Sequence, residues 1–155
     1  MSSWVSHLPD FASTLYASIT GLGLNKTELL ENPVLTSWDV HDLNNDLTLP
    51  YDDLAFDGVV TSVSIQYLVK PVEIFAEVGR VLRPGSLFAV TFSNRMFPTK
   101  AVAIWQALSD YQHAQLVKTY FRLAGTFDEA QFYDLSPAPG RSDPLFAVVA
   151  KKMKN

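Results

Sequence analysis

GVVTSVSI at residues 58–65, PVEIFAEVGRVLRPG at 71–85 and SLFAVTFS at 86–93 decide the fold. The first segment is β-branched and almost continuously small or apolar, which is typical of a strand buried on both faces of a sheet. The second begins with a proline that a first helical turn tolerates, and its apolar residues recur at helical spacing. A strand, a helix and another strand in this order predict two parallel strands joined by a crossover, with 58–65 as a central strand.

The same alternation continues on both sides of this unit. Strands are predicted at 18–24, 36–40, 130–136 and 145–151, and helices at 11–17, 26–32, 100–108 and 113–124. The turn-forming PAPGRSDP separates the last two strands, which indicates a hairpin. The sequence therefore predicts an α/β fold in one domain over residues 1–155: a doubly wound, mainly parallel sheet with helices on both faces and a C-terminal antiparallel hairpin.

Composition excludes several classes of partner. The chain has 155 residues, 48% of them hydrophobic, and a net charge of −4, so it lacks the basic surface expected of a protein that wraps nucleic acid or lies on an anionic membrane. Its apolar runs are far too short for a membrane span. There is no cysteine, and the three histidines have no metal-binding spacing, so we expect no metal site. A cytoplasmic location is predicted, and the oligomeric state is left open.

Ligands of open parallel sheets bind where strands end, so the informative loops are 21–25, 42–45, 64–68 and 93–97. GLGLNK at 21–26 has the first two glycines of a dinucleotide-binding turn, but Lys26 stands where the third is needed. The chain also contains no G-x-S-x-G elbow and no phosphate-binding G-x-x-x-x-G-K-[ST] loop. A nicotinamide enzyme, a serine hydrolase and a P-loop protein are therefore disfavoured.

The stretch LPYDDLAFDGVVTSVSIQYLVKPVEIFAEVGRVLRPGSLFAVTF at 49–92 resembles the core of the class I S-adenosylmethionine-dependent methyltransferases, which are Rossmann-like. Leu-Pro-aromatic, Phe-Asp at a strand start and Arg-x-Leu-x-Pro-Gly occur in the family's order. SSWVSHLP and FSNRMFPTKAVAIW are typical of a type 11-like subgroup found in cyanobacteria and plants. The resemblance implies S-adenosyl-L-methionine as cofactor and methyl transfer to a small-molecule acceptor. The alternative is a non-catalytic remnant or partner-binding module with an incomplete cofactor site.

In that subgroup an apolar strand ending in Asp-Leu comes directly before the Met-Ser-Ser-Trp loop with which this chain begins. The resemblance therefore implies an N-terminally truncated domain that lacks its first central strand, or a start site that has been placed too late. That strand would lie between the predicted strands at 18–22 and 58–65.

The resemblance also implies which residues hold the cofactor. Asp42 and the backbone N–H of Leu43 would bind adenine, although Asp42 could instead cap a turn in its Asn/Asp-rich loop. Ser64 follows the predicted central strand. In the first loop, Ser2, Ser3 and Trp4 replace the family's glycine-rich turn and would contact the cofactor. At the ribose position the chain has Gly23 and Asn25 instead of the family's carboxylate.

On the acceptor side the resemblance points to Gln66, Tyr67, Asn94 and Arg95. Tyr67 could equally be a packing residue. Arg95 could bind an anion or pair with a nearby carboxylate. His113 is expected to be a surface cap rather than a general base. No residue is assigned as catalytic, because methyl transfer from a sulfonium mainly requires alignment of the reacting atoms and exclusion of water.

Overall fold

The computed structural model describes residues 16–138 and 141–154, and the chain divides into two units, Met1–Asp46 and Leu47–Asn155. In the first unit, β1 (Thr20–Gly23) and β2 (Ser37–Val40) pair in parallel through α2 (Lys26–Glu31). Helix α2 begins there because Asn25 caps it: the Asn25 side chain accepts from the N–H of Thr27 at 3.0 Å. The predicted strands at 18–24 and 36–40 and the helix at 26–32 are confirmed.

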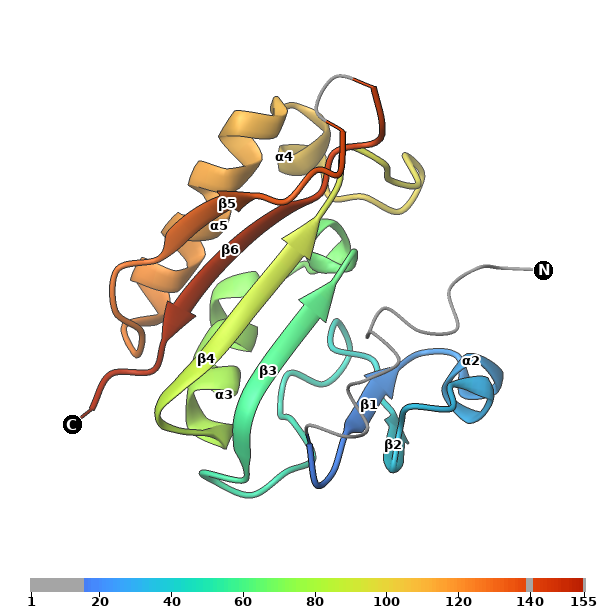
Figure 1. Ribbon diagram of the computed structural model, residues 1–155, viewed down its shortest axis with the longest axis vertical. Coiled ribbons are helices and arrows are strands. Elements are labelled where there is room, and N and C mark those ends of the chain that lie inside the picture. The colour runs from blue at the N-terminus through green and yellow to red at the C-terminus, as the bar shows by residue number, and fades with distance from the viewer. Residues whose placement is uncertain (1–15, 139–140, 155) are drawn as a thin grey trace. The chain divides into compact units, whose positions relative to one another are not determined.

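The second unit contains a four-stranded sheet (Figure 1). Its strands are β3 (Phe56–Ser62), β4 (Leu82–Phe92), β5 (Gln131–Asp134) and β6 (Phe146–Lys151), in the spatial order β3-β4-β6-β5. β3 and β4 are parallel, whereas β6 is antiparallel to both β4 and β5. The α/β fold class and the C-terminal hairpin are therefore confirmed.

The longer helices of this unit lie on one face of its sheet, behind it in Figure 1. They are α3 (Pro71–Val81) and α5 (Asp110–Ala124); shorter turns are η1 (Ile65–Tyr67) and α4 (Ala103–Gln106). Helix α5 begins earlier than predicted because Ser109 and Gln112 form a capping box, and it ends at Gly125, whose φ of 71° suits glycine.

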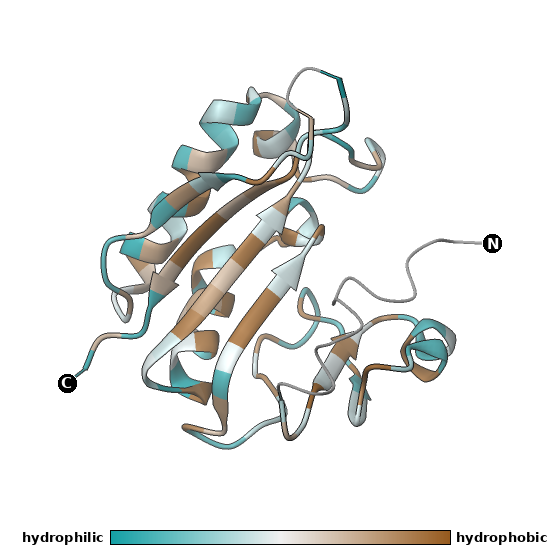
Figure 2. Ribbon diagram, in the orientation of Figure 1, coloured by the Kyte–Doolittle hydropathy of each residue, from teal (hydrophilic) through white to brown (hydrophobic). Residues whose placement is uncertain are grey.

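The core of this unit is aromatic. Phe75 of α3, Phe88 of β4 and Phe121 of α5 are each about 99% buried and meet edge to face, with ring centroids 4.8–5.2 Å apart. Figure 2 shows the hydrophobic residues concentrated along β4 and β6. This core holds β4 in place and so positions the loops that follow the carboxyl ends of β3 and β4.

β3 was predicted to be a central strand, but in this unit it lies at the edge of the sheet. In the part of the chain that the structure describes, β3 pairs with β4 alone, and Val60 in its middle is 58% exposed. The continuous apolar run at 58–65 predicted burial on both faces, and within this unit that prediction is wrong. The run also stops being a strand earlier than predicted, because Val63 leaves it with a positive φ of 48°.

Candidate functional site

The LPY segment before β3 is held in place by Arg80 of α3. The Arg80 guanidinium donates to the carbonyls of Leu49 and Tyr51 at 3.0 and 2.8 Å and to the carboxylates of Glu77 and Asp53. Glu77 in turn accepts from the N–H of Leu49 at 3.0 Å. The hydrogen bond from Arg80 lowers the pKa of Glu77. The motif residues here therefore have a structural role, which is to fix the entry into β3.

In the first unit, Asp42 follows β2 as predicted and is exposed. Its Oδ1 accepts from the N–H of Asn44 at 3.0 Å, so the turn-capping alternative is realised. The other carboxylate oxygen, Oδ2, and the N–H of Leu43 have no hydrogen-bond partner among the described residues. One acceptor and one adjacent donor are what an adenine edge requires, so this pair fits the cofactor implied by the sequence.

The ribose position is less suited to a ligand. Gly23 lies at the end of β1, where its carbonyl accepts from the N–H of His41 at 3.0 Å. The Asn25 side chain is occupied by Thr27 and by Glu28, to which its Nδ2 donates at 2.9 Å. The structure thus gives Asn25 a capping role. It also places the carboxylate of Glu28 beside it, a residue that the sequence analysis did not select.

In the second unit, the loops after β3 and β4 are joined to each other. Phe97 donates its N–H to the Tyr67 hydroxyl at 3.0 Å, and Val102 donates to the backbone carbonyl of Gln66 at 2.9 Å. Ser64 precedes the η1 turn, and its half-buried side chain caps nothing. Ser64, Gln66 and Tyr67 therefore lie at the carboxyl end of β3, in and just before one turn that is bonded to the segment after β4.

Two features of this turn are energetically unfavourable. The Gln66 side chain is 0% exposed, yet neither Oε1 nor Nε2 has a hydrogen-bond partner. Val63 adopts its positive φ although it is β-branched, which costs about 1–3 kcal/mol. Unsatisfied polar groups and backbone strain of this kind gather at functional sites, and here they flank Ser64.

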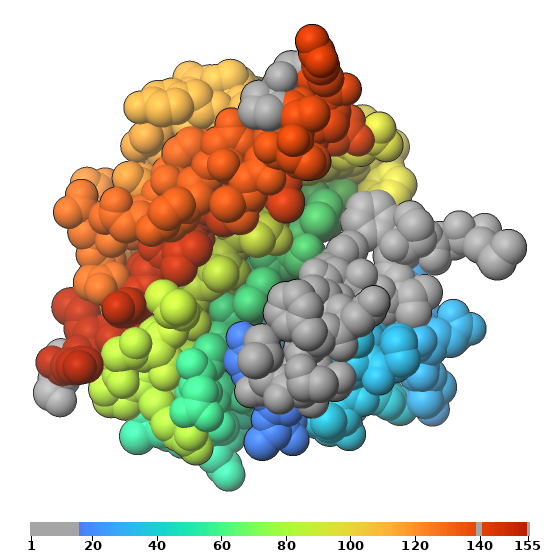
Figure 3. All heavy atoms as spheres, viewed as in Figure 1, coloured from blue at the N-terminus to red at the C-terminus, as the bar shows by residue number. Residues whose placement is uncertain are grey.

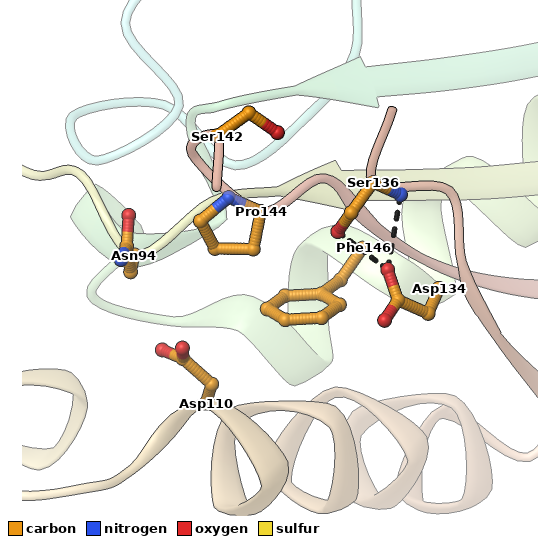
Figure 4. Close-up of a pocket in the computed structure, with 7 residues that line it drawn as sticks. All are labelled: Asn94, Asp110, Asp134, Ser136, Ser142, Pro144 and Phe146. Atoms are coloured by element: carbon orange, nitrogen blue, oxygen red, sulfur yellow. Dashed lines mark hydrogen bonds between the residues drawn. The ribbon is translucent and has the colours of Figure 1, made fainter. Parts of the chain in front are cut away.

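Asn94 and Arg95 follow β4, and Arg95 pairs with a carboxylate, one of the two alternatives for it. Its Nε lies 2.6 Å from Oδ2 of Asp143, in the β5–β6 connection. Figure 3 shows this connection beside the residues that follow β4. Asn94 lines an open pocket there, together with residues from α5 and the hairpin: Asp110, Asp134, Ser136, Ser142, Pro144 and Phe146 (Figure 4).

Three members of this region were missed or misread in the sequence. Asp110 and Asp134 were not selected, because each is an ordinary polar residue at a helix start or strand end. His113 was expected on the surface, but it is 4% exposed and stacks on Trp105 with ring centroids 4.0 Å apart. Its Nε2 donates to the Trp105 carbonyl at 2.7 Å. The expectation of a surface cap is therefore wrong, because α4 covers the imidazole.

Ser2, Ser3 and Trp4 lie outside the described residues, so their predicted role stays a prediction. No group of three or more potential metal ligands occurs in 16–138 or 141–154. Within the same ranges, no helix has the length and apolar character needed to cross a membrane.

Comparison with known proteins identifies the family of this chain. Residues 6–90, more than half of the chain, match the model of a family described as a methyltransferase domain. A stretch of 80 residues is 36% identical to Methyltransferase phqN of Penicillium fellutanum, covering 48% of this chain and 24% of that protein. A stretch of 77 residues is 27% identical to the biotin biosynthesis bifunctional protein BioHC of Teredinibacter turnerae, covering 50% of this chain and 13% of that protein. The chain thus matches only a small part of each relative.

Solved structures share the fold at low identity. A methyltransferase of Methanosarcina mazei described as SAM-dependent superposes with a TM-score of 0.57 at 17% identity, covering 94% of this chain and 86% of that one. Phosphoethanolamine N-methyltransferase 2 of Haemonchus contortus, solved with S-adenosylhomocysteine, superposes with a TM-score of 0.62 at 13% identity, covering 93% of this chain and 46% of that one. The [4+2]-cyclase SpnF superposes with a TM-score of 0.65 at 17% identity, covering 89% of this chain and 68% of that one. The chain belongs to the family described as a methyltransferase domain.

Proposed function

We propose that this chain transfers a methyl group from S-adenosyl-L-methionine to a small-molecule acceptor bound where β3 and β4 end. The observation that carries the proposal is the polar edge of the parallel pair. Because β3 and β4 run in the same direction, their loops meet at one edge, where Gln66, Tyr67 and Asn94 lie. The buried, unpartnered amide of Gln66 supports a binding role for this edge.

The cofactor would supply an electrophilic methyl group, and the residues of this chain would bind and orient it. Asp42 and Leu43 would hold adenine through Oδ2 and the backbone N–H, and Glu28 is a candidate ribose partner beside Asn25. Ser64 would lie toward the methionine part, as would Ser2, Ser3 and Trp4. The Tyr67 hydroxyl, held against the N–H of Phe97, would keep the loop after β4 closed over the acceptor.

We further propose that the active enzyme contains an additional parallel strand. The open edge of β3 and the exposure of Val60 support this. So does β1, which pairs with β2 alone among the described residues, since parallel strands are normally buried in larger sheets. The additional strand would be the apolar strand ending in Asp-Leu that the family resemblance implies.

A second candidate function is a non-catalytic, partner-binding module with the same fold. Two observations favour it: the side chain of Asn25 is already used by α2, and a strand edge like that of β3 is a ready template for another chain. The cytoplasmic location and the single domain over residues 1–155 stay predictions under either function.

Calorimetric titration with S-adenosylhomocysteine separates the two functions. We expect weak or no binding by this chain, and clear binding by a chain lengthened with the extra strand. Incubation of the lengthened chain with S-adenosyl-L-methionine and small amines, alcohols and acids should then give a methylated product. If neither chain binds S-adenosylhomocysteine, the methyltransferase proposal is refuted in favour of the module. Micromolar binding by the present chain would refute the need for another strand.

A further inference from the structure

The pocket lined by Asn94 contains two carboxylates and no lysine or arginine. Asp134, at the end of β5, accepts from the hydroxyl and the N–H of Ser136, and these hydrogen bonds lower its pKa. Asp110, at the start of α5, has a side chain that is 44% exposed. Neither carboxylate forms an ion pair with a lysine or an arginine in the described part of the chain. The pocket therefore has negative charge that is not neutralised locally.

His113 supplies an independent sign of a missing donor. Because a carbonyl can only accept, Nε2 of His113 donates to Trp105, and Nδ1 is the second polar atom of the ring. This nitrogen is buried and has no hydrogen-bond partner among the described residues, and Oδ1 of Asp110, which lines the pocket, is 3.8 Å away. A buried polar atom without a partner is costly, and a donor group bound at Asp110 would lie near this nitrogen.

The aromatic part of the pocket suits a cation as well. In Figure 4 the ring of Phe146 lies between the carboxylates of Asp110 and Asp134. Phe146 is held by its neighbours, with ring centroids 5.7 Å from Phe132 and 5.8 Å from Phe92. The face of a fixed aromatic ring attracts a positively charged nitrogen. The carboxylates of Asp110 and Asp134 beside the Phe146 ring would therefore bind best a ligand that carries a positive charge and hydrogen-bond donors.

We propose that this pocket binds the protonated primary or secondary amine of a small molecule. Its N–H groups would donate to Asp110 and Asp134, and its charge would lie against Phe146. If the proposed function is correct, on which this second step rests, the methyl acceptor is a molecule that carries such an amine.

The test is a titration of the whole chain with n-butylammonium, followed by ¹H–¹⁵N NMR, with butan-1-ol as the uncharged counterpart. We expect butylammonium to shift the Asn94 side-chain amide and the backbone signals of Ser136 and Phe146, and butan-1-ol to leave them unchanged. Asp110→Asn and Asp134→Asn should each weaken binding about tenfold, the loss of one charged hydrogen bond. Glu129→Gln, which removes an exposed carboxylate outside the pocket, should not change it.

The inference is overturned if butylammonium does not bind, if butan-1-ol binds equally well, or if both Asp→Asn variants keep the original affinity. Circular dichroism of each variant shows that an affinity change does not reflect unfolding. The result is independent of the cofactor. If the lengthened chain binds S-adenosylhomocysteine and neither chain binds butylammonium, the proposed function is kept and the amine pocket is refuted. If butylammonium binds and neither chain binds S-adenosylhomocysteine, the pocket is kept and the methyltransferase is refuted.

Discussion

Replacing Gln66 with methionine should stabilise the protein. Methionine has nearly the shape of glutamine but no amide, and the Gln66 side chain is fully buried with both polar atoms unpartnered. Each buried, unsatisfied polar group costs about 1–3 kcal/mol. Removing both should therefore raise the free energy of unfolding by about 2–6 kcal/mol, a large change for a domain of this size. Stabilising substitutions at such positions usually reduce function, so ligand binding should weaken.

The measurement is urea denaturation followed by tryptophan fluorescence, comparing midpoints at equal slopes. The matched control is Gln106→Met in α4, because Nε2 of Gln106 donates to the carbonyls of Pro98 and Ala101 at 3.0 and 2.7 Å. That variant should lose about 1 kcal/mol, the net worth of typical hydrogen bonds. A Gln66→Met variant that is as stable as the parent, or less stable, would show that the amide has partners in solution and would refute the reasoning.

Three further substitutions test other contacts. Arg80→Leu should lower the free energy of unfolding by about 2–4 kcal/mol, because hydrogen bonds to two carboxylates and two carbonyls are lost. The lowered pKa of Glu77 stabilises the folded protein above the ordinary carboxyl pKa, and this stability is lost as the pH falls through the pKa of Glu77 in the folded protein. Arg80→Leu should also abolish this pH-dependent contribution. Urea midpoints measured across pH 2–7 test both effects. Val63→Gly should raise the unfolding midpoint by relieving about 1 kcal/mol of strain, whereas Val59→Gly in regular β3 should lower it. In a chain that binds S-adenosylhomocysteine, Asp42→Ala should weaken the binding free energy by about 1–3 kcal/mol, as measured by calorimetry. An unchanged dissociation constant would show that Asp42 is not part of the site.

The elements that were predicted correctly have local signals. The periodicity of 71–81 and the proline before it place α3, and the turn-rich segment after 136 places the hairpin. The start of α5 was missed, although its signal is also local: Ser109 and Gln112 stand at capping-box spacing. A search for that pattern would have moved the helix start back to Asp110. The helix predicted at 100–108 shrinks to α4 because Phe97 and Val102 are held by the η1 turn instead.

The pocket could not be predicted in the same way, because its contacts join distant parts of the sequence. Asp110 and Asp134 come from α5 and β5, and only the packing of the hairpin beside β4 places them around Phe146. The Arg95–Asp143 pair likewise depends on that packing, which is why two alternatives for Arg95 stayed open in the sequence. The family resemblance predicted acceptor-side residues after β3 and β4, but the chemistry of this pocket is visible only in three dimensions.

The carboxyl half of β3 combines an exposed strand residue, a strained backbone and an unsatisfied amide, and these features have two different remedies. A strand added beside β3 would cover Val60 and pair its backbone edge. It would not satisfy Gln66, whose amide is already buried beneath the turn that Val102 and Phe97 hold in place. If the sheet were the only incomplete part, the lengthened chain would leave the Gln66→Met gain unchanged. A ligand hydrogen-bonded to Gln66 would abolish that gain when it binds, so measuring the gain with and without S-adenosylhomocysteine separates an incomplete sheet from a binding site.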